Sequence, residues 1–577
     1  MVLPLASCRG FAEQFSTPKF FLTKFLIITA LAIWGLGRIW TAPPRRFHFN
    51  LALPLFAFSI AALISCLASP VPRFSLMEVE FALCGPAWVL LLSAWERGES
   101  AIRKVSVLIA LAGALVAAIT LLQRFGFDPV LLGGYQVDWG SMVARMRLYA
   151  TFGNPNFVGG YLIGTIFAAL ALVAASKSTS AKVLWLSFAM IMLAAIIETV
   201  SCGAWLGLAL GLAAAAMNLL PRKDSRHQDN QVSFWGSKSF VPPFAYGPMA
   251  LLTLSLAGRA AAQFYGRLYL WRFSWPIFWQ HPLMGSGWGT YQLFYLDLQG
   301  KFLSAHPEYA GYWTNNRLVH NDPLQVLLET GLLGFTAFVW VLGKYGQQAL
   351  RVRRQSASAW PRYAIAASVG GVTAILVDSL FNYQFAVPPT YILLFTLLAI
   401  PSILRDDGFE KESGGQPLPA LTARPYPRHV TWKGAGSIAI VAAASGLLWQ
   451  QTRVLASERF YQTASDLEDH NDLAGAESTF RRSVELNDLN GRAHFGLSRV
   501  LFSRGLFSEA LSEIALAERT YADSHQEVLR GLIMEHMGKN SEALAAYRHA
   551  FWLDPTLMSV QEDINRLGKP QSQHIPH

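Results

Sequence analysis

The stretch HNDPLQVLLETGLLG, residues 320–334, joins a polar, histidine-bearing loop directly to a membrane-crossing helix. Asp322 followed by Pro323 predicts an N-cap and a first-turn proline, so the helix should begin just after His320. A histidine at that boundary lies where a lipid-borne substrate meets water, and it can exchange a proton near neutral pH. We therefore expect His320 to be a general base, with a capping or interfacial histidine as the alternative.

Apolar segments long enough to cross a membrane fill the chain on both sides of this stretch, up to about residue 450. Of the 577 residues, 53% are hydrophobic and 15% are charged, and the mean hydropathy is +0.31. Such values are typical of polytopic membrane proteins and exclude a soluble enzyme. The segments number about twelve and lie near 21–38, 51–69, 77–95, 104–122, 157–176, 181–199, 203–220, 243–261, 324–343, 363–381, 385–403 and 434–450. We predict an all-α, polytopic membrane protein.

Lysine and arginine residues predict how these helices are oriented. They gather in the loops near 38–46, 97–104, 177–182, 222–226, 344–354 and 405–411, which alternate onto one side. By the positive-inside rule this side is cytoplasmic, so the long loop 262–323 lies outside, with 124–156 and everything after residue 450. The N-terminus falls outside as well, although Arg9, Lys19 and Lys24 fit that placement poorly. The net charge of +10 therefore reports topology, and we expect no nucleic-acid partner.

The chain divides into a membrane domain, 1–455, and a polar, helix-forming domain, 456–577. Ala476, Ala510 and Ala543 recur at spacings of 34 and 33 residues in similar surroundings. Helix pairs at that period resemble tetratricopeptide repeats, in which a small alanine lets two helices pack closely. Such repeats bind a protein partner on their concave face, and a passive cap or spacer is the alternative.

The predicted outer loop carries residues suited to a phosphate-bearing lipid. Arg267 and Trp271 lie four residues apart, so they should share one face of a helix. The planar fork of arginine suits a pyrophosphate, while the aromatic ring meets lipid or sugar. The alternative is an interfacial aromatic belt with snorkelling arginines.

Four further polar residues are candidates for the site. Asn154 and Asn156 open the helix at 157, where they would cap it or hydrogen-bond sugar hydroxyls, and capping is the preferred reading. Glu329 and Asp378 lie within apolar segments, where an ionisable group is costly and often functional, although a structural hydrogen bond is the simpler account. We expect neither a metal nor a cofactor, because no HExxH or DxD run appears.

Three motifs in this order resemble the O-antigen ligase and polymerase superfamily. They are GNPNFVGGYL at 153–162, GRxxxW followed by HPLxGxGxGTY between 266 and 291, and HNxxLxxxxExGxxG at 320–334. The resemblance covers about residues 20–405 and implies a metal-independent glycosyltransferase of the bacterial inner membrane. Such an enzyme takes a glycan from an undecaprenyl-pyrophosphate carrier at the periplasmic face and transfers it to a hydroxyl of a lipid, sugar or protein acceptor.

The resemblance also implies roles for individual residues. His320 would activate the acceptor hydroxyl, and Arg267 would stabilise the pyrophosphate leaving group. Asn321 and Glu329 would position the helix that follows His320. Under this interpretation an O-antigen ligase is the leading function; a polysaccharide polymerase, a protein O-oligosaccharyltransferase and a non-enzymatic envelope assembly scaffold are the alternatives.

One position departs from the family pattern. Many members carry Ser-Arg at a helix start where this chain has Ser201-Cys202, and that arginine is thought to help bind the pyrophosphate. A cysteine cannot supply the charge. Either Arg147, Arg259 or Arg272 replaces it, or the chain uses a different donor.

Overall fold

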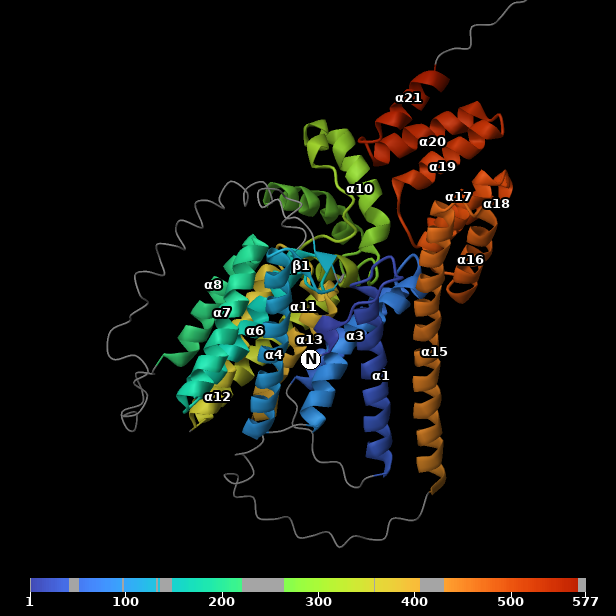
Figure 1. Ribbon diagram of the computed structural model, residues 1–577. Helices are drawn as coiled ribbons and strands as arrows, with labels where there is room; N and C mark the ends of the chain where they lie inside the picture. The colour runs from blue at the N-terminus through green and yellow to red at the C-terminus, as the bar shows by residue number, and fades with distance from the viewer. Residues whose placement is uncertain are drawn as a thin grey trace, which may run out of the picture.

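The computed structural model of the chain is built almost entirely from helices. It describes residues 2–40, 51–95, 98–130, 133–134, 148–220, 264–356, 358–404 and 430–568. Figure 1 shows a bundle of long helices with a group of shorter helices above one end of it. The strands β1 (Phe127–Asp128) and β2 (Gly133–Gly134) form only a short antiparallel pair. The predicted all-α class is confirmed.

The bundle follows the predicted apolar segments closely. Its helices are α1 (Thr17–Trp40), α2 (Ala52–Leu67), α3 (Pro72–Trp95), α4 (Gly98–Arg124), α6 (Pro155–Ala175), α7 (Thr179–Thr199), α8 (Cys202–Leu219), α11 (Asp322–Gln355), α12 (Ala359–Asp378), α13 (Pro388–Leu404) and α15 (Val430–Asp469). Eleven of the predicted segments coincide with these helices, and the twelfth, 243–261, lies outside the described residues. Within the described ranges nine helices are long and apolar enough to cross a membrane, and α2 and α13 are shorter apolar helices.

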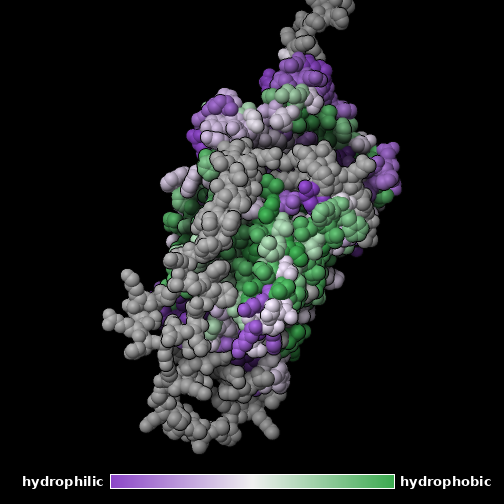
Figure 2. All heavy atoms as spheres, turned by 60° about the vertical axis from the view of Figure 1, so that its left-hand side comes forward, coloured by the Kyte–Doolittle hydropathy of each residue, from purple (hydrophilic) through white to green (hydrophobic). Residues whose placement is uncertain are grey.

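The surface of the bundle is hydrophobic, as helices in contact with lipid require. Figure 2 shows hydrophobic side chains gathered over the bundle and hydrophilic ones over the shorter helices at the top. Exposed apolar residues of the bundle include Leu53, Phe56, Leu186, Leu210 and Trp340. This distribution agrees with a multi-pass membrane protein.

Glycines allow the central helices of the bundle to approach closely. An added Cβ at Gly207 of α8 would lie 2.5 Å from the carbonyl oxygen of Ala374 in α12, and one at Gly211 would lie 2.6 Å from that of Gly370. Helices in lipid associate mainly through van der Waals packing, and small residues at their crossings allow the close approach that this packing needs. The close contact fixes the end of α12 beside the start of α8.

Helix α11 is broken at Gly331, which has φ of 63° and ψ of −166°. The break frees backbone groups, and the loop 282–287 pairs with them. Leu332 N donates to Pro282 O (2.9 Å) and Gly287 N donates to Glu329 O (3.0 Å). Non-helical backbone at such a depth persists only where its polar groups find partners inside the protein. The sequence predicts one continuous helix at 324–343, so this interruption corrects that prediction.

Residues 264–321, before α11, form a helical layer on the end of the bundle. This layer contains the helix 264–280, α10 (Tyr291–Ala305) and the 3-10 helix η3 (Pro307–Tyr312). At the same end α15 leads into α16 (Leu473–Leu486), α17 (Gly491–Ser503), α18 (Phe507–Ala517), α19 (Ser524–His536), α20 (Asn540–Leu553) and α21 (Met558–Leu567). We call α16 to α21 the tail helices. The predicted boundary after residue 455 falls within the single helix α15.

The tail helices form pairs, and each repeat alanine lies in their core. Ala476, Ala510 and Ala543 are fully buried, as close packing of two helices requires. The tail docks on the helical layer, where Trp313 Nε1 donates to the carbonyl oxygen of Leu553 (2.9 Å). The structure therefore places the loop 264–323 and the tail at one end of the bundle (Figure 1).

The N-terminal segment lies at this end as well. Lys19 is buried, and its Nζ donates to the carbonyl oxygens of Ala6, Phe15 and Thr151. Lys24 lies 3.4 Å from Glu80. Both lysines therefore have partners within the protein, Lys19 three carbonyl oxygens and Lys24 a carboxylate.

Candidate functional site

His320 lies immediately before α11 in a rarely adopted backbone conformation. Its φ is 55°, in the left-handed region that non-glycine residues seldom enter. The side chain is only 8% exposed, and its Nε2 lies 3.2 Å from Asn316 Oδ1. Strain of this kind persists where the surrounding structure imposes it, and it is common at functional sites.

The hydrogen bond with Asn316 decides which nitrogen of His320 carries the proton. Asn316 Nδ2 donates to Thr314 Oγ1 (2.7 Å), so Oδ1 is the atom that faces the histidine. A carbonyl oxygen only accepts, and we therefore assign the proton to Nε2 and the lone pair to Nδ1. Nδ1 is buried and has no hydrogen-bond partner among the residues that the structure describes.

The start of α11 is fixed by two neighbouring side chains. Asn321 is the N-cap, and its Oδ1 accepts from Leu324 N (3.0 Å). The sequence predicts Asp322 as the cap, so the cap lies one residue earlier than expected. Asp322 instead accepts from Phe385 N (3.0 Å), and its own N–H donates to Ser379 O (2.8 Å). These bonds tie Asp322, two residues after His320, to the connection between α12 and α13.

That connection, residues 379–387, is where the sequence motifs meet. Asp378 at the end of α12 accepts from Asn382 Nδ2 (2.7 Å) and Gln384 Nε2 (2.5 Å). Gln384 Nε2 also lies 3.3 Å from the carbonyl oxygen of Asn156. An added Cβ at Gly203, the second residue of α8, would lie 2.4 Å from Asp378. The GNPN segment and the start of α8 therefore both contact this polar turn.

Tyr383 connects the same turn to the histidine. Its ring centroid lies 4.5 Å from that of His320 in an edge-on arrangement and 4.9 Å from that of Phe157. The His320 motif, the GNPN motif and the turn after α12 thus converge around one side chain.

Arg267 brings a positive charge close to His320 and Tyr383. It lies in the first turn of the helix 264–280, is half-buried, and has neither a hydrogen bond nor an ion pair within the described part of the chain. Burial lowers the pKa of its guanidinium, which still remains charged near neutral pH. Burial and then the charge of Arg267 lower the pKa of His320 below its ordinary value. An unpaired cation therefore lies within electrostatic range of a neutral imidazole.

Glu329 holds the helical layer against α11. Its Oε2 accepts from Gly289 N (2.9 Å), and its Oε1 accepts from Tyr291 N (3.3 Å) and Gln325 Nε2 (3.2 Å). A carboxylate at the N-terminus of α10 is favoured by the helix dipole. Glu329 therefore positions the start of α10 relative to α11.

The other predicted residues have separate places. Asn154 caps α6 by accepting from Asn156 N (2.9 Å), so the capping interpretation is confirmed. Arg272 Nη1 donates to Tyr309 OH (2.8 Å), which holds this arginine within the aromatic side chains of the outer layer. Arg147 and Arg259 lie outside the described residues. Cys202 begins α8 beside the turn that follows Asp378.

Sequence reasoning did not select Asn316, Tyr383 or Gln384. The signal for the last two was their position, because polar residues follow one another in the short connection between two apolar segments. Asn316 gave no such signal, since it lies among many polar residues of the long loop. Its role depends on the chain folding back on itself before α11.

A comparison with protein families finds one match in the membrane domain. Residues 163–339 match the family model described as O-antigen ligase. The matched range contains Arg267, His320 and the break at Gly331, and it leaves out the GNPN segment and the tail. No curated protein matches the chain. Residues 163–339 are thus similar to the O-antigen ligase superfamily, and together with the apolar helices this indicates a multi-pass bacterial membrane protein.

Proposed function

We propose that the chain is a glycosyltransferase of the bacterial inner membrane. It would transfer a saccharide from an undecaprenyl-pyrophosphate carrier to an acceptor hydroxyl at the periplasmic face. The observation that carries the proposal is the buried, unpaired Nδ1 of His320 beside the unpaired charge of Arg267. Both residues lie within the part of the chain that matches the O-antigen ligase model.

The proposed reaction assigns each group one task. Nδ1 of His320 takes the proton of the acceptor hydroxyl while that oxygen attacks the anomeric carbon of the donor sugar. The bond between this carbon and the pyrophosphate oxygen breaks, and the carrier pyrophosphate leaves with the electron pair. Arg267 stabilises the negative charge that develops on it. The proposal assigns no step to a metal, because Arg267 supplies the required positive charge.

Asn316 contributes through His320. When Nδ1 gains the proton, Nε2–H continues to donate to Asn316 Oδ1, so the imidazolium keeps a hydrogen-bond partner. Asn316 is therefore a positioning residue that fixes the tautomer before the reaction and stabilises the cation during it.

A deletion strain that produces His320→Ala tests the proposal. We expect the transferred glycan to disappear from the surface while lipid-linked saccharide accumulates. Long unattached chains in that pool indicate a ligase, and single repeat units indicate a polymerase. His306→Ala is the matched control, since this histidine of the same loop is 44% exposed and pairs with Glu308. Unchanged surface glycan in a normally produced His320→Ala protein would contradict the proposal.

A further inference from the structure

A cavity of about 620 Å³ lies between the bundle and the tail. Its walls come from α1, α3, the loop 288–292, the first turns of α11, helix α15 and the tail turns near 487–492 and 520–521. Sites that enclose a small-molecule-sized group have volumes of roughly 300–1,000 Å³. The tail is therefore one wall of a compartment of that size.

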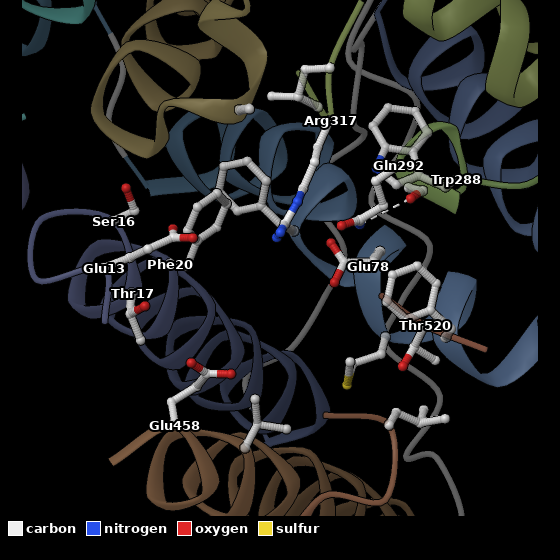
Figure 3. A pocket seen from close by; sticks show the side chains of 18 of the residues that line it. Glu13, Ser16, Thr17, Phe20, Glu78, Trp288, Gln292, Arg317, Glu458 and Thr520 are labelled. Carbon is white, nitrogen blue, oxygen red and sulfur yellow. Dashed lines mark hydrogen bonds between the residues drawn. The ribbon is translucent and has the colours of Figure 1, made fainter. Parts of the chain in front are cut away.

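Glu78 of α3 faces this cavity without a partner. It forms no hydrogen bond or ion pair with the described residues, whereas Glu13 and Glu458 each lie 3.3 Å from nitrogens of Arg492. Figure 3 shows the side chains of Glu78 and Arg317 pointing into the cavity. Glu78 is half-buried, and Lys24 and Arg492 line the same cavity, so its carboxylate is open to a ligand hydroxyl that enters there.

The loop 288–292 fixes the position of this carboxylate. An added Cβ at Gly289 would lie 2.8 Å from Cβ and Cγ of Glu78. Gly289 N donates in turn to Glu329 (2.9 Å), which belongs to α11. Glu78 is thus packed against the same loop that completes the break in α11.

Flat rings and amide groups line the cavity beside the charged side chains of Lys24, Arg317 and Arg492. Phe20, Phe81 and Trp288 supply the rings, and Gln292, Gln325 and Asn487 supply the amides. Aromatic faces pack on the apolar faces of sugar rings, and amides and carboxylates bind sugar hydroxyls as acceptors or donors. The mixture suits a saccharide of a few rings and does not suit a folded protein, which this volume cannot hold.

The cavity reaches the surroundings of His320. Leu318 and Asp322, on either side of the histidine in sequence, both line it, and so does Tyr383. The ring of Tyr383 lies 4.5 Å from that of His320. A saccharide in the cavity would therefore have one end at Tyr383, whose ring contacts the proposed base.

We propose that this cavity is the acceptor site, that the tail helices complete it, and that Glu78 accepts a hydrogen bond from a hydroxyl of a saccharide acceptor. The inference rests on the proposed transferase function. It gives the tail a role in the site itself, beside the partner binding that the repeats predict, since its turns form part of the cavity wall.

Photo-crosslinking tests the site separately from catalysis. A benzophenone amino acid replaces Met77, which lines the cavity, in the full chain carrying His320→Ala, so that bound acceptor is not consumed. Leu76 is the matched control position, because it is 39% exposed and does not line the cavity. We expect a saccharide-bearing adduct at position 77, none at 76, and a loss of roughly 10- to 100-fold when Glu78→Gln is added.

Capture of only phospholipid or peptide at position 77 would overturn the inference, and so would equal saccharide capture with Glu78→Gln. Either result leaves the proposed function intact if His320→Ala alone abolishes transfer. The wall that α15 contributes has its own pair of variants. Val454→Trp narrows the cavity and should lower surface glycan at least tenfold, whereas Thr452→Trp, which is exposed on the same helix outside the cavity, should not. Equal glycan in both variants would also overturn the inference.

Discussion

The break in α11 and the docked tail meet at the same end of the bundle, but they are held there in different ways. At Gly331 the loop 282–287 is bound by backbone hydrogen bonds, and an added Cβ would lie 2.4 Å from the carbonyl group of Leu283. The tail is held by side chains, among them Trp552, whose Nε1 donates to Ser304 Oγ (2.7 Å). An added side-chain atom at Gly331 would collide with backbone, which cannot move aside. A side-chain contact of the tail can be removed by one substitution while the others remain. The part that carries the proposed chemistry is therefore fixed more strictly than the part that shapes the acceptor site.

The largest effect is expected from Gly331→Ala. The substitution combines a positive φ with a collision against backbone, so we expect a loss of stability on the order of 3–5 kcal/mol together with loss of transfer. Gly343→Ala in the same helix is the control, because nothing lies within 4 Å of its added Cβ. Thermal unfolding of both purified variants measures the difference. Similar melting temperatures for the two would show that the break is not fixed as described.

Replacement of Trp552 by alanine should have the next largest effect. Its ring lies 3.0 Å from the position of an added Cβ at Gly300 of α10, so its removal opens the contact between the tail and the helical layer. We expect docking to weaken by about 2 kcal/mol. Hydrogen exchange should then rise in α10 and α20 while the region around Gly331 stays protected. Increased exchange around Gly331 would mean that the two regions are coupled.

Asn316→Ala should reduce transfer without unfolding the chain. Loss of one hydrogen bond to the imidazole leaves its tautomer and orientation less defined, and a decrease of roughly tenfold is expected. Asn315→Ala is the control, since that side chain contacts Tyr295 instead. Initial rates of transfer in membranes with matched protein levels provide the comparison. Equal rates for the two variants would remove Asn316 from the mechanism.

The smallest effect is expected at the tail's ion pair with α3. Arg73 Nη1 lies 2.9 Å from Asp488, and both side chains are more than 60% exposed (71% and 62%). Exposed pairs of this kind contribute less than about 1 kcal/mol, so Arg73→Gln should leave docking nearly unchanged at physiological salt. Hydrogen exchange in α17 measures this outcome. A marked increase there would mean that charge, rather than the tryptophan contacts, holds the tail.

The sequence predicted features that depend on local patterns and missed those that depend on contacts between distant segments. Hydropathy predicted eleven helices correctly because a spanning helix needs a long apolar run, and the spacing of Ala476, Ala510 and Ala543 selected three alanines that lie in the core of the tail. Neither pattern contains the break at Gly331, because it depends on a loop about 45 residues earlier in the chain supplying the missing partners. The cavity at Glu78 was likewise hidden, since it exists only after the tail has docked.

Among the site residues, His320 and Arg267 were predicted from local motifs, and the structure brings them within electrostatic range of each other. The sequence could not predict Asn316, because its hydrogen bond with His320, which fixes the lone pair on Nδ1, forms only in the folded chain. Of the arginines expected to replace the charge missing at Cys202, Arg272 donates to Tyr309 OH, and Arg147 and Arg259 lie outside the described residues.

The pH dependence of transfer tests the central claim, that His320 is a neutral base whose lone pair lies on Nδ1. Burial and Arg267 lower the pKa of His320, so the base should stay neutral as the pH falls, and the rate should show no acid limb from this residue between about pH 7 and pH 5. Asn316→Asp places a carboxylate beside Nε2, which raises the pKa of His320 and should introduce an acid limb within that interval. An acid limb near the ordinary histidine pKa in the unmodified chain, or profiles that do not differ between the two proteins, would contradict the claim.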